Sequence, residues 1–538
     1  MYKKKLQVSF YIFALALLAS CGEGFAIEDG ISFIGSDPAT SCPINYLGEP
    51  SQLAQLAQKI KKNNLYVNKF ISNKIQITST RLQKQTEKIK LSISVDKQCS
   101  SFLKSEMLSQ KIINNSTTAN IPSLNKQSYS YSIKKSKFAD FKKQVEKDYC
   151  VKQVSIETSF RLIKSVKLKD PVLQSKISKY YNKSTQPHED FNDKFLFRQS
   201  HLWATSFFEA FKKFYANVGG LKDTDKKTIV AIVDTPIYKP NEDFATDLFL
   251  PHLVKARGGV DHGTHIAGLI AATSNNELGI VGVASKSVKL LSSAIETNDE
   301  GGFELGQLRD ALVSINNLAK SNSSFPQVIN LSLESNDSVG TCKESNPAIS
   351  NIIKNLLDDG VSIVVAAGNG IEVKDKQKGQ ELKLGTFLKY PACLSNEAGF
   401  EGLITVGSVT TDSVKNSPMK VSEFSNYSPK YVNIAAPGDS ITFGGLYSTI
   451  RGKGSSTNKY DWKRGTSMSA PLVTSAIALS YSVLNKKRNI GATTTDKKSV
   501  FEKCGVTDIN KPKFIKKLIL DSAVKRGDFA DKWENGNV

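Results

Sequence analysis

The chain has 538 residues, enough for roughly two to four domains, and 40% of them are hydrophobic, which is sufficient for a large buried core. The net charge of +21 is unevenly distributed, because residues 41–200 contain 29 Lys and Arg but 12 Asp and Glu. This asymmetry indicates two units with different roles, the basic one having either a solvated surface or a surface for anionic partners. No nucleic-acid-binding motif accompanies the charge, so we do not expect nucleic acid as a partner.

Residues 1–20 predict a secretory signal peptide, because the basic run M-Y-K-K-K precedes a short apolar run. The run ends in Leu18-Ala19-Ser20-Cys21, which resembles the lipobox of bacterial lipoproteins, whose cysteine becomes the acylated first residue. The resemblance implies an exported, membrane-anchored lipoprotein of the bacterial cell envelope, in the periplasm or at the outer membrane and cell surface. An ordinary signal peptide, for which Cys21 has no role, is the alternative. We expect no other segment that is long and apolar enough to span a membrane.

Six further cysteines remain in the exported chain, and an even number favours disulfide bonds. The sequence alone does not fix how they pair. They are Cys42, Cys99, Cys150, Cys342, Cys393 and Cys504.

The region from residue 21 to 195 is rich in Lys, Ser, Asn and Gln. A helical pattern in S-Q-L-A-Q-L-A-Q-K-I-K-K alternates with the period-2 runs K-I-K-L-S-I-S-V and S-Y-S-Y-S-I. These patterns predict a small α+β domain.

From about residue 225 the chain predicts an α/β fold, because short β-branched runs alternate with helical patterns. The predicted buried strands are K-T-I-V-A-I-V-D, V-K-L-L-S-S-A-I, P-Q-V-I-N-L-S-L, V-S-I-V-V-A-A and G-L-I-T-V-G-S-V. Helical patterns start at His262, Leu305 and Asn346. We expect a doubly wound, mostly parallel sheet with helices on both faces and functional residues at the carboxyl ends of the strands.

Three polar residues stand at the expected ends of these elements. Asp234 directly follows the first buried strand, His262 opens a helix in H-G-T-H-I-A-G, and Ser467 opens another in G-T-S-M-S-A-P. The two motifs and the order Asp, His, Ser resemble the subtilase family of subtilisin-like serine peptidases. The segments N-L-S-L, V-V-A-A-G-N, A-A-P-G and the last helix, K-F-I-K-K-L-I-L-D-S-A, extend the resemblance over residues 195–528.

The resemblance implies an exported serine endopeptidase that hydrolyses protein or peptide substrates through an acyl-enzyme. Ser467 would be the nucleophile, His262 its base, and Asp234 the residue that orients the histidine. Asn369 would stabilise the oxyanion, and the chemistry would use no cofactor. Pro471 would fit the first turn of the nucleophile's helix. Ser469 is the alternative nucleophile.

We expect four segments in the chain: a signal peptide at 1–20, a basic region at 21–195, a subtilisin-like domain at 196–530 and a tail at 531–538. Subtilases are commonly made with a pro-region that blocks the cleft until it is cut. The basic region is therefore either such a pro-region or an anchoring domain.

Two departures from the family pattern stand near the predicted site. Pro236 replaces a glycine in Asp234-Thr235-Pro236, which leaves Thr235 to hold the carboxylate. Glu334 replaces a glycine after N-L-S-L, where the family's substrate pocket lies. Its carboxylate either faces this pocket and favours Arg or Lys, or lies at the solvent-exposed rim, which is the reading we prefer. The implied pocket walls are Ser332, Leu333 and Glu334 on one side and Ala366, Ala367 and Gly368 on the other.

Other sites are implied by the resemblance or are rivals to it. Secreted bacterial subtilases often carry a disulfide at the places of Cys342 and Cys393, and Cys504 would pair with an N-terminal cysteine. Some relatives bind calcium in the loop of Asn275 and Asn276, which here differs in length by one residue, so a structural calcium ion stays one of two alternatives.

Two rival functions remain. The first is a non-catalytic binding lipoprotein on the same fold. The second is a zinc hydrolase that uses Asp261, His262 and His265, because histidines three residues apart on a helix suit a metal.

Overall fold

The protein divides, in this computed structural model, into two compact units, one spanning Leu18–Glu157 and the other including Thr158–Val538. The second of these units includes strand β5 (Phe160–Leu162), which lies in the region 21–195 of the sequence-based division. The structure describes the following residues: 88–96, 118–121, 126–134, 151–156, 160–162, 191–205, 207–208, 210–212, 227–251, 253–254, 261–298, 301–318, 323–336, 338–374, 376–411, 419–441, 443–452, 459–485, 488–489, 497–503, 505–525 and 529–538.

The first unit contains a four-stranded antiparallel sheet in the order β2-β3-β1-β4. Its strands are β1 (Lys88–Asp96), β2 (Thr118–Ile121), β3 (Lys126–Lys134) and β4 (Val151–Ile156). The two period-2 runs are thus confirmed as the strands β1 and β3, which pair along their whole length. The predicted helical run at 51–62 and Cys21, Cys42, Cys99, Cys150 and Cys504 lie outside the described residues.

A seven-stranded sheet forms the centre of the second unit, in the order β15-β14-β11-β9-β6-β7 with β16 also paired to β14. All neighbours run parallel except β15, which is antiparallel to β14. The strands are β6 (Thr228–Asp234), β7 (Val288–Ala294), β9 (Val328–Leu331), β11 (Ser362–Ala366), β14 (Leu403–Thr411), β15 (Lys420–Val421) and β16 (Ile434–Ser440). The mostly parallel sheet expected from the β-branched runs is therefore confirmed.

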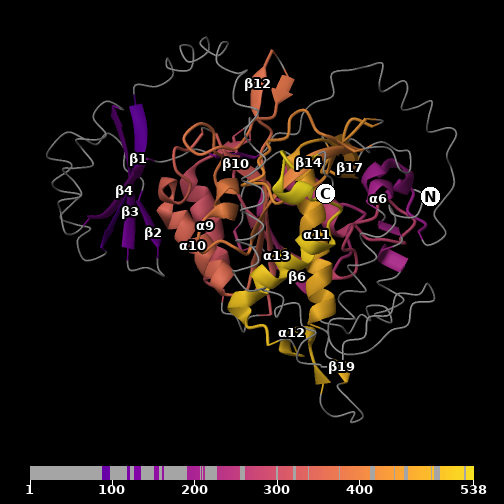
Figure 1. Ribbon diagram of the computed structural model, residues 1–538. Helices are drawn as coiled ribbons and strands as arrows, with labels where there is room; N and C mark the ends of the chain where they lie inside the picture. Colours follow the sequence, from indigo (N-terminus) through magenta and orange to yellow (C-terminus); the bar gives the residue numbers. More distant parts are fainter. Residues whose placement is uncertain are drawn as a thin grey trace, which may run out of the picture. The chain divides into compact units, whose positions relative to one another are not determined.

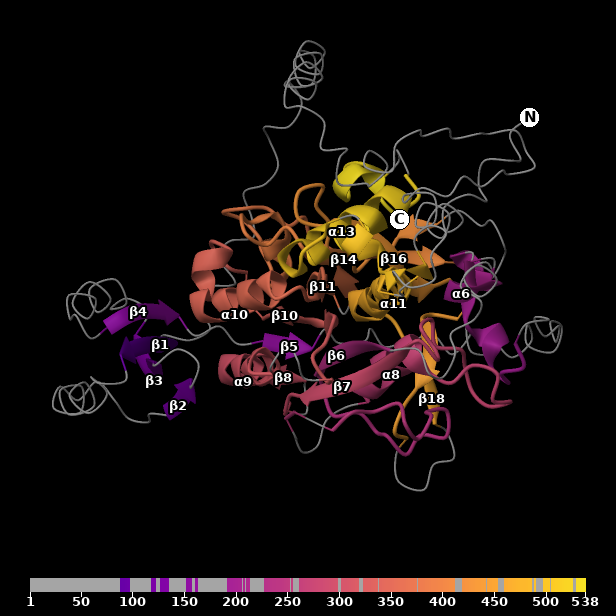
Figure 2. The same ribbon diagram turned by 90° about the horizontal axis from the view of Figure 1, so that it is seen from below.

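Helices cover both faces of this sheet (Figures 1 and 2). Successive residues of a strand point to opposite faces, so a strand between the two layers contacts helices on both sides. Ile229, Ala231 and Val233 of β6 belong to one apolar core with α9 and α10. Thr228, by contrast, bonds to the carbonyl of Ala478 in α11 on the other face. The main helices are α8 (His262–Ala271), α9 (Leu305–Asn316), α10 (Pro347–Asp358), α11 (Thr466–Leu484) and α13 (Lys511–Ser522). Asp234 falls on the same side of β6 as Thr228, toward α8 and α11.

The helix α11 is long and apolar enough to cross a membrane by length and composition, contrary to the expectation that no segment beyond the signal peptide would be. It packs on α8 and on five strands of the sheet, and 89% of its apolar window is buried inside the protein. We therefore interpret α11 as the core helix of this unit.

A second, three-stranded sheet lies beside the first, in the order β10-β5-β8. Its strands are β5 (Phe160–Leu162), β8 (Gly302–Phe303) and β10 (Leu333–Ser335). The central strand β5 comes from the region that the sequence assigned to the N-terminal domain, and it pairs antiparallel with both neighbours.

Smaller elements complete the unit. They are α6 (Ser200–Ala204), the pair β12 (Ile371–Val373) and β13 (Lys376–Lys378), the pair β17 (Leu446–Thr449) and β18 (Tyr460–Lys463), the pair β19 (Arg488–Asn489) and β20 (Lys497–Lys498), α12 (Val500–Lys503), and the 3-10 turns Leu196–Arg198, Lys343–Ser345, Ala392–Asn396, Asp508–Asn510 and Glu534–Gly536. A disulfide joins Cys342 to Cys393, which matches the pairing implied by the family resemblance.

Candidate active site

The carboxylate of Asp234 lies against the imidazole of His262 in the interior of the protein. The Nδ1 atom of His262 is 2.8 Å from Oδ1 and 3.0 Å from Oδ2 of Asp234. A carboxylate accepts hydrogen bonds, so Nδ1 carries the proton and Nε2 presents its lone pair. Within the described residues Nε2 has no hydrogen-bond partner, although it is buried. This arrangement leaves Nε2 able to accept a proton from another group.

Thr235 fixes the carboxylate despite the proline that follows it. Its backbone N–H donates to Oδ1 of Asp234 at 2.8 Å, and its hydroxyl lies 3.3 Å from the same oxygen. The hydroxyl oxygen also accepts the N–H of Gly263, which ties the start of α8 to the end of β6. A side chain at position 263 would clash, because its Cβ would lie 2.3 Å from the carbonyl oxygen of Thr235. The departure at Pro236 therefore leaves the support of Asp234 in place.

Ser467 is the second residue of α11 and is fully buried. Its hydroxyl lies 3.4 Å from the carbonyl oxygen of Ser332, and the Ser332 hydroxyl donates to the Ser467 carbonyl at 3.1 Å. Pro471 explains the second contact, since proline has no N–H to give to the carbonyl four residues earlier. Pro471 is the sixth residue of α11, so the expectation that it lies in the first turn was wrong.

The alternative site residues point elsewhere. The hydroxyl of Ser469 lies beside Gly438 on β16, where an added Cβ would come within 2.2 Å of it. The Nε2 atom of His265 is 3.1 Å from the carbonyl oxygens of Leu446 and Asp461, and burial lowers the pKa of His265 well below its usual value. Ser469 and His265 therefore have packing roles in this structure.

The three proposed zinc ligands do not converge. Asp261 accepts the N–H of Arg451 at 2.7 Å, His262 bonds to Asp234, and His265 bonds to backbone carbonyls. Among the residues that the structure describes, no group of three or more His, Cys, Asp or Glu side chains could hold a metal ion.

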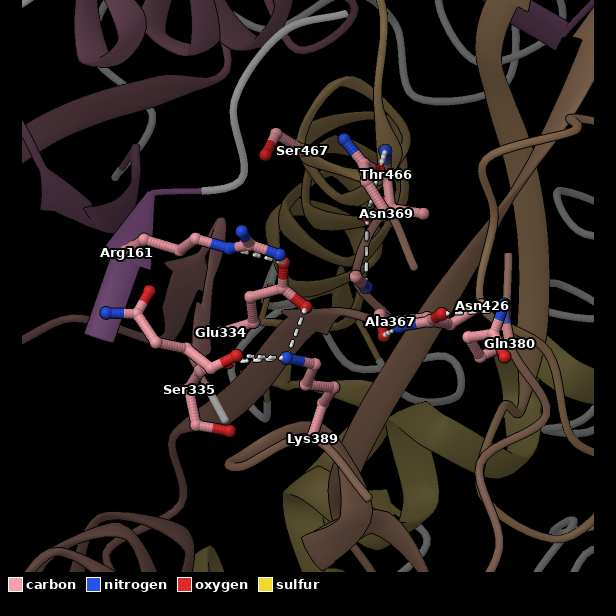
Figure 3. A network of polar contacts seen from close by, with 12 residues as sticks. Arg161, Glu334, Ser335, Ala367, Asn369, Gln380, Lys389, Asn426, Thr466 and Ser467 are labelled. Atoms are coloured by element: carbon pink, nitrogen blue, oxygen red, sulfur yellow. Dashed lines mark hydrogen bonds and ion pairs between the residues drawn. The ribbon is translucent and has the colours of Figure 1, made fainter. Parts of the chain in front are cut away.

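The amide of Asn369 is clamped next to Ser467 (Figure 3). Its Oδ1 accepts the N–H of Thr466 at 3.0 Å and the Thr466 hydroxyl at 3.1 Å, and that hydroxyl in turn accepts the N–H of Gly368 at 3.1 Å. Gly465 has a φ of 151° and lies so close that an added Cβ would be 2.8 Å from Nδ2 of Asn369. Because Oδ1 is occupied by donors, the amide is oriented with Nδ2 as its donor toward the N-terminus of α11.

The predicted pocket walls lie next to each other. Ala367 accepts a hydrogen bond from the amide of Asn426, and a Cβ on Gly368 would come within 2.3 Å of Oε2 of Glu334. Leu333 is fully buried and Glu334 is 1% exposed. The preferred placement of Glu334 at a solvent-exposed rim is therefore wrong: the carboxylate is buried beside Gly368, and nearby cations compensate its charge.

Several contacts at this site had no signal in the sequence. Lys389 lies 4.0 Å from Glu334, and Arg161 bonds to the same carboxylate from β5. Thr466 belongs to the motif G-T-S-M-S-A-P, but nothing in the motif indicates that it is the partner of Asn369. A three-residue strand such as β5 is too short to give a periodic pattern.

The loop of Asn275 and Asn276 is closed by hydrogen bonds to two carboxylates. The N–H of Asn275 donates to both oxygens of Asp193 at 3.0 Å, and the amide of Asn276 donates to Asp243 at 2.9 Å. Burial raises the pKa of Asp243 to about 7. Carboxylate and amide oxygens are ligands that calcium accepts, and a calcium ion at this loop stays a prediction.

Known proteins resemble the second unit in sequence and in fold. A family model described as the subtilase family matches residues 225–537, more than half of the chain. The major intracellular serine protease of Bacillus subtilis (strain 168) is 34% identical over 219 residues, 40% of this chain and 54% of that protein. Subtilisin-like protease 3 of Plasmodium falciparum (isolate 3D7) is 29% identical over 278 residues, 51% of this chain and 31% of that protein.

A solved structure has the same fold. Fervidolysin from Fervidobacterium pennivorans, described as a keratinolytic enzyme related to subtilisin, matches 84% of this chain and 59% of its own with a TM-score of 0.53 and 19% sequence identity. The match spans about a third to a half of the length of the two curated relatives above. Together with the match of the family model, these findings show that the chain belongs to the subtilase family.

Proposed function

We infer that this chain is a serine endopeptidase that cleaves proteins or peptides through Asp234, His262 and Ser467. The observation that carries the proposal is the oriented histidine: Asp234 binds Nδ1 of His262 at 2.8 Å, which leaves the lone pair of Nε2 as a base. Ser467, at the N-terminus of α11, is the nucleophile that this base serves.

The reaction follows from these positions. The Ser467 hydroxyl attacks the scissile carbonyl carbon while Nε2 of His262 takes its proton, and the carboxylate of Asp234 stabilises the imidazolium. The oxyanion of the tetrahedral intermediate accepts hydrogen bonds from Nδ2 of Asn369 and from the Ser467 N–H. The imidazolium then gives its proton to the leaving amine, and water hydrolyses the acyl-enzyme by the same route. Side chains, one backbone N–H and water perform every step, so the proposal includes no cofactor.

The N-terminal segment supports a role for the region before residue 195 as a pro-region. The strand β5 pairs with β10, and the register places Leu162 opposite Leu333, next to Ser332. Ser332 in turn contacts Ser467. An extended segment that pairs with the strand next to Ser332 has the placement expected of a bound substrate strand. We propose that residues 160–162 block this groove until the chain is cut on the C-terminal side of Leu162.

Export and lipid anchoring complete the proposal, and they rest on the sequence pattern of residues 1–21. In this proposal Cys21 carries the lipid, and the protein lies at a membrane of the bacterial cell envelope. Intact-mass analysis of the protein from a membrane fraction tests the anchor, since Cys21→Ala should lose the lipid mass and the membrane association. If the masses of the wild type and of Cys21→Ala differed only by the substitution itself, the lipid anchor would be rejected.

The central experiment is labelling by a fluorophosphonate probe combined with peptide hydrolysis. Wild type should be labelled, and Ser467→Ala should lose both the label and about 10⁶-fold in kcat. Ser469→Ala is the matched control on the same helix and should keep both. Label that persists in Ser467→Ala, or equal losses in the two variants, would reject the assignment of Ser467. A wild type without either activity would favour the binding lipoprotein.

The same samples test processing and metal dependence. Ser467→Ala should stay at full length while wild type shortens, and identical masses would reject self-processing. Inhibition by a chelator but not by the fluorophosphonate would favour the zinc hydrolase. Calcium binding at Asn275 and Asn276 stays a prediction, which calorimetric titration of the Ser467→Ala protein with calcium ions tests.

A further inference from the structure

Glu334 on β10 places a buried carboxylate beside the paired strand β5 (Figure 3). Its side chain is 1% exposed, and its Oε1 accepts two hydrogen bonds from Arg161, at 3.0 Å from Nε and 2.8 Å from Nη2. Its Oε2 faces Nζ of Lys389 at 4.0 Å. Two cations thus approach the carboxylate, one on each oxygen.

The two cations differ in how firmly they are attached. Lys389 is buried in the wall, and its Nζ donates to the carbonyl oxygens of Ser335 and Asn336 at 2.9 and 2.7 Å. Arg161 is 29% exposed and reaches Glu334 from a separate strand. Among the described residues, only Arg161 donates hydrogen bonds to this carboxylate. Removal of β5 would therefore take away both hydrogen-bond donors of Oε1, and a replacing strand with an arginine in the same place would restore them.

The two residues that flank Arg161 on β5 have buried side chains in apolar surroundings. Phe160 is fully buried, and its ring lies 5.8 Å from that of Phe303 and 6.2 Å from that of Tyr390. Leu162 is 1% exposed and pairs with Leu333. Any strand that replaces β5 between β10 and β8 in this register presents its middle side chain to Glu334 and its two flanking side chains to these apolar places.

We propose that Glu334 is a specificity-determining residue that selects substrates with an arginine at the position opposite it. The substrate class is a protein or peptide segment in which a large apolar residue, an arginine and a second large apolar residue precede the cut bond. Arg161 and its neighbours are the chain's own copy of this sequence. The inference rests on the proposed peptidase function, because it names the substrates of that same groove.

The kinetic test uses a quenched fluorescent decapeptide with the sequence of residues 158–167, T-S-F-R-L-I-K-S-V-K, and versions with Lys, Gln or Glu in place of its arginine. Rates are measured on the purified protein and normalised to Ser467 sites labelled by the fluorophosphonate. Wild type should prefer Arg over Gln about tenfold or more in kcat/KM, which equals about 1.4 kcal/mol. Lys should lie between them, and Glu should be the poorest.

The matched variants isolate the carboxylate. Glu334→Gln should reduce the preference for Arg over Gln to about twofold or less, and because this preference is a ratio of two rates on one protein, a change in the overall rate cancels from it. Glu344→Gln changes an exposed glutamate on a neighbouring turn and should keep the wild-type preference. Equal kcat/KM for the Arg and Gln peptides in wild type would overturn the inference and leave the peptidase proposal standing.

A binding measurement separates this inference from catalysis. In the Ser467→Ala/Arg161→Glu protein, like charges oppose each other at positions 161 and 334, so β5 should leave the groove. A fluorescein-labelled decapeptide should then bind, and its Gln version should bind about tenfold more weakly. Ser467→Ala/Arg161→Lys should keep the groove closed and bind less peptide. Equal binding of the two peptides, or no binding to the charge-reversed protein, would overturn the assignment of Glu334 even if no peptide were cleaved.

Discussion

Two buried carboxylates stand at this site, and they are held in different ways. Asp234 is fully buried and receives hydrogen bonds from Thr235 and His262, which belong to the central sheet and the helix packed on it. Glu334 is almost as buried but receives its hydrogen bonds from Arg161, 173 residues earlier in the chain, on a strand of three residues. The first pair is therefore built from neighbouring parts of one fold, whereas the second joins distant segments and, in our proposal, is a contact that a substrate replaces.

The largest expected effect is at Asp234. The amide of Asp234→Asn has one accepting oxygen where the carboxylate has two, so it does not fix His262 with its proton on Nδ1. We therefore expect kcat to fall by about 10⁴-fold for every peptide. Glu334→Gln is the paired control, since it should change the order of preference among peptides rather than the rate on all of them. Steady-state rates per labelled site measure both. A loss below tenfold in Asp234→Asn would show that the histidine is oriented by other groups.

Asn369 should contribute next, because its amide is fixed by Thr466 rather than by substrate. Asn369→Ala should lower kcat by about 10²- to 10³-fold with little change in KM. Saturation kinetics on one good peptide separate the two constants. An effect confined to KM would mean that Asn369 binds substrate in the ground state, like the groove residues around Glu334.

A substitution of Lys389 tests whether the ion pair between Lys389 and Glu334 contributes to the stability of the fold. Lys389→Met leaves Glu334 without its buried cation and should lower the free energy of unfolding by about 3 kcal/mol. Urea unfolding in the Ser467→Ala background measures this without self-digestion. The Lys389→Met/Glu334→Gln protein should lose less, because the only charge left without its partner is that of Arg161, which is partly exposed to water. If the single and double variants lost the same, the ion pair would have no part in stability.

A third buried carboxylate, that of Asp243, is expected to give the smallest of these effects, a change in the pH dependence of stability. Asp243 accepts hydrogen bonds from the Ile280 N–H and the Asn276 amide, and burial raises its pKa to about 7, with Asp193 and Glu242 adding to the rise. The folded state therefore binds the proton more tightly than the unfolded state. This stability contribution is complete below about pH 4 and is lost as the pH rises through about 7.

Asp243→Asn is neutral at every pH and should lack this contribution to the pH dependence. Its Tm relative to the parent Ser467→Ala protein should become more favourable from pH 5 to pH 8. Differential scanning calorimetry at the two pH values gives this difference directly. A difference that stays constant across this range would show that Asp243 is already ionised in the folded protein.

The sequence predicted the parts of this site that local patterns encode. Buried β-branched runs marked the strands β6, β7, β9, β11 and β14, because a parallel sheet covered on both faces needs apolar residues at nearly every position. The ends of these strands and the helix starts then identified Asp234, His262 and Ser467. Carboxyl ends of parallel strands meet at one edge, so residues distant in the chain could be assigned to one site before any contact was known.

What only the tertiary structure decided is the environment of each side chain. The sequence placed Glu334 at the rim, whereas the fold buries it between Gly368, Lys389 and Arg161. No periodicity links a three-residue strand to a partner 173 residues away, since such a pairing depends on the shape of the assembled groove. The sequence by itself therefore determined the family, the sheet and the candidate catalytic residues. The compensation of buried charge, which depends on groups brought together by folding, was decided by the tertiary structure alone.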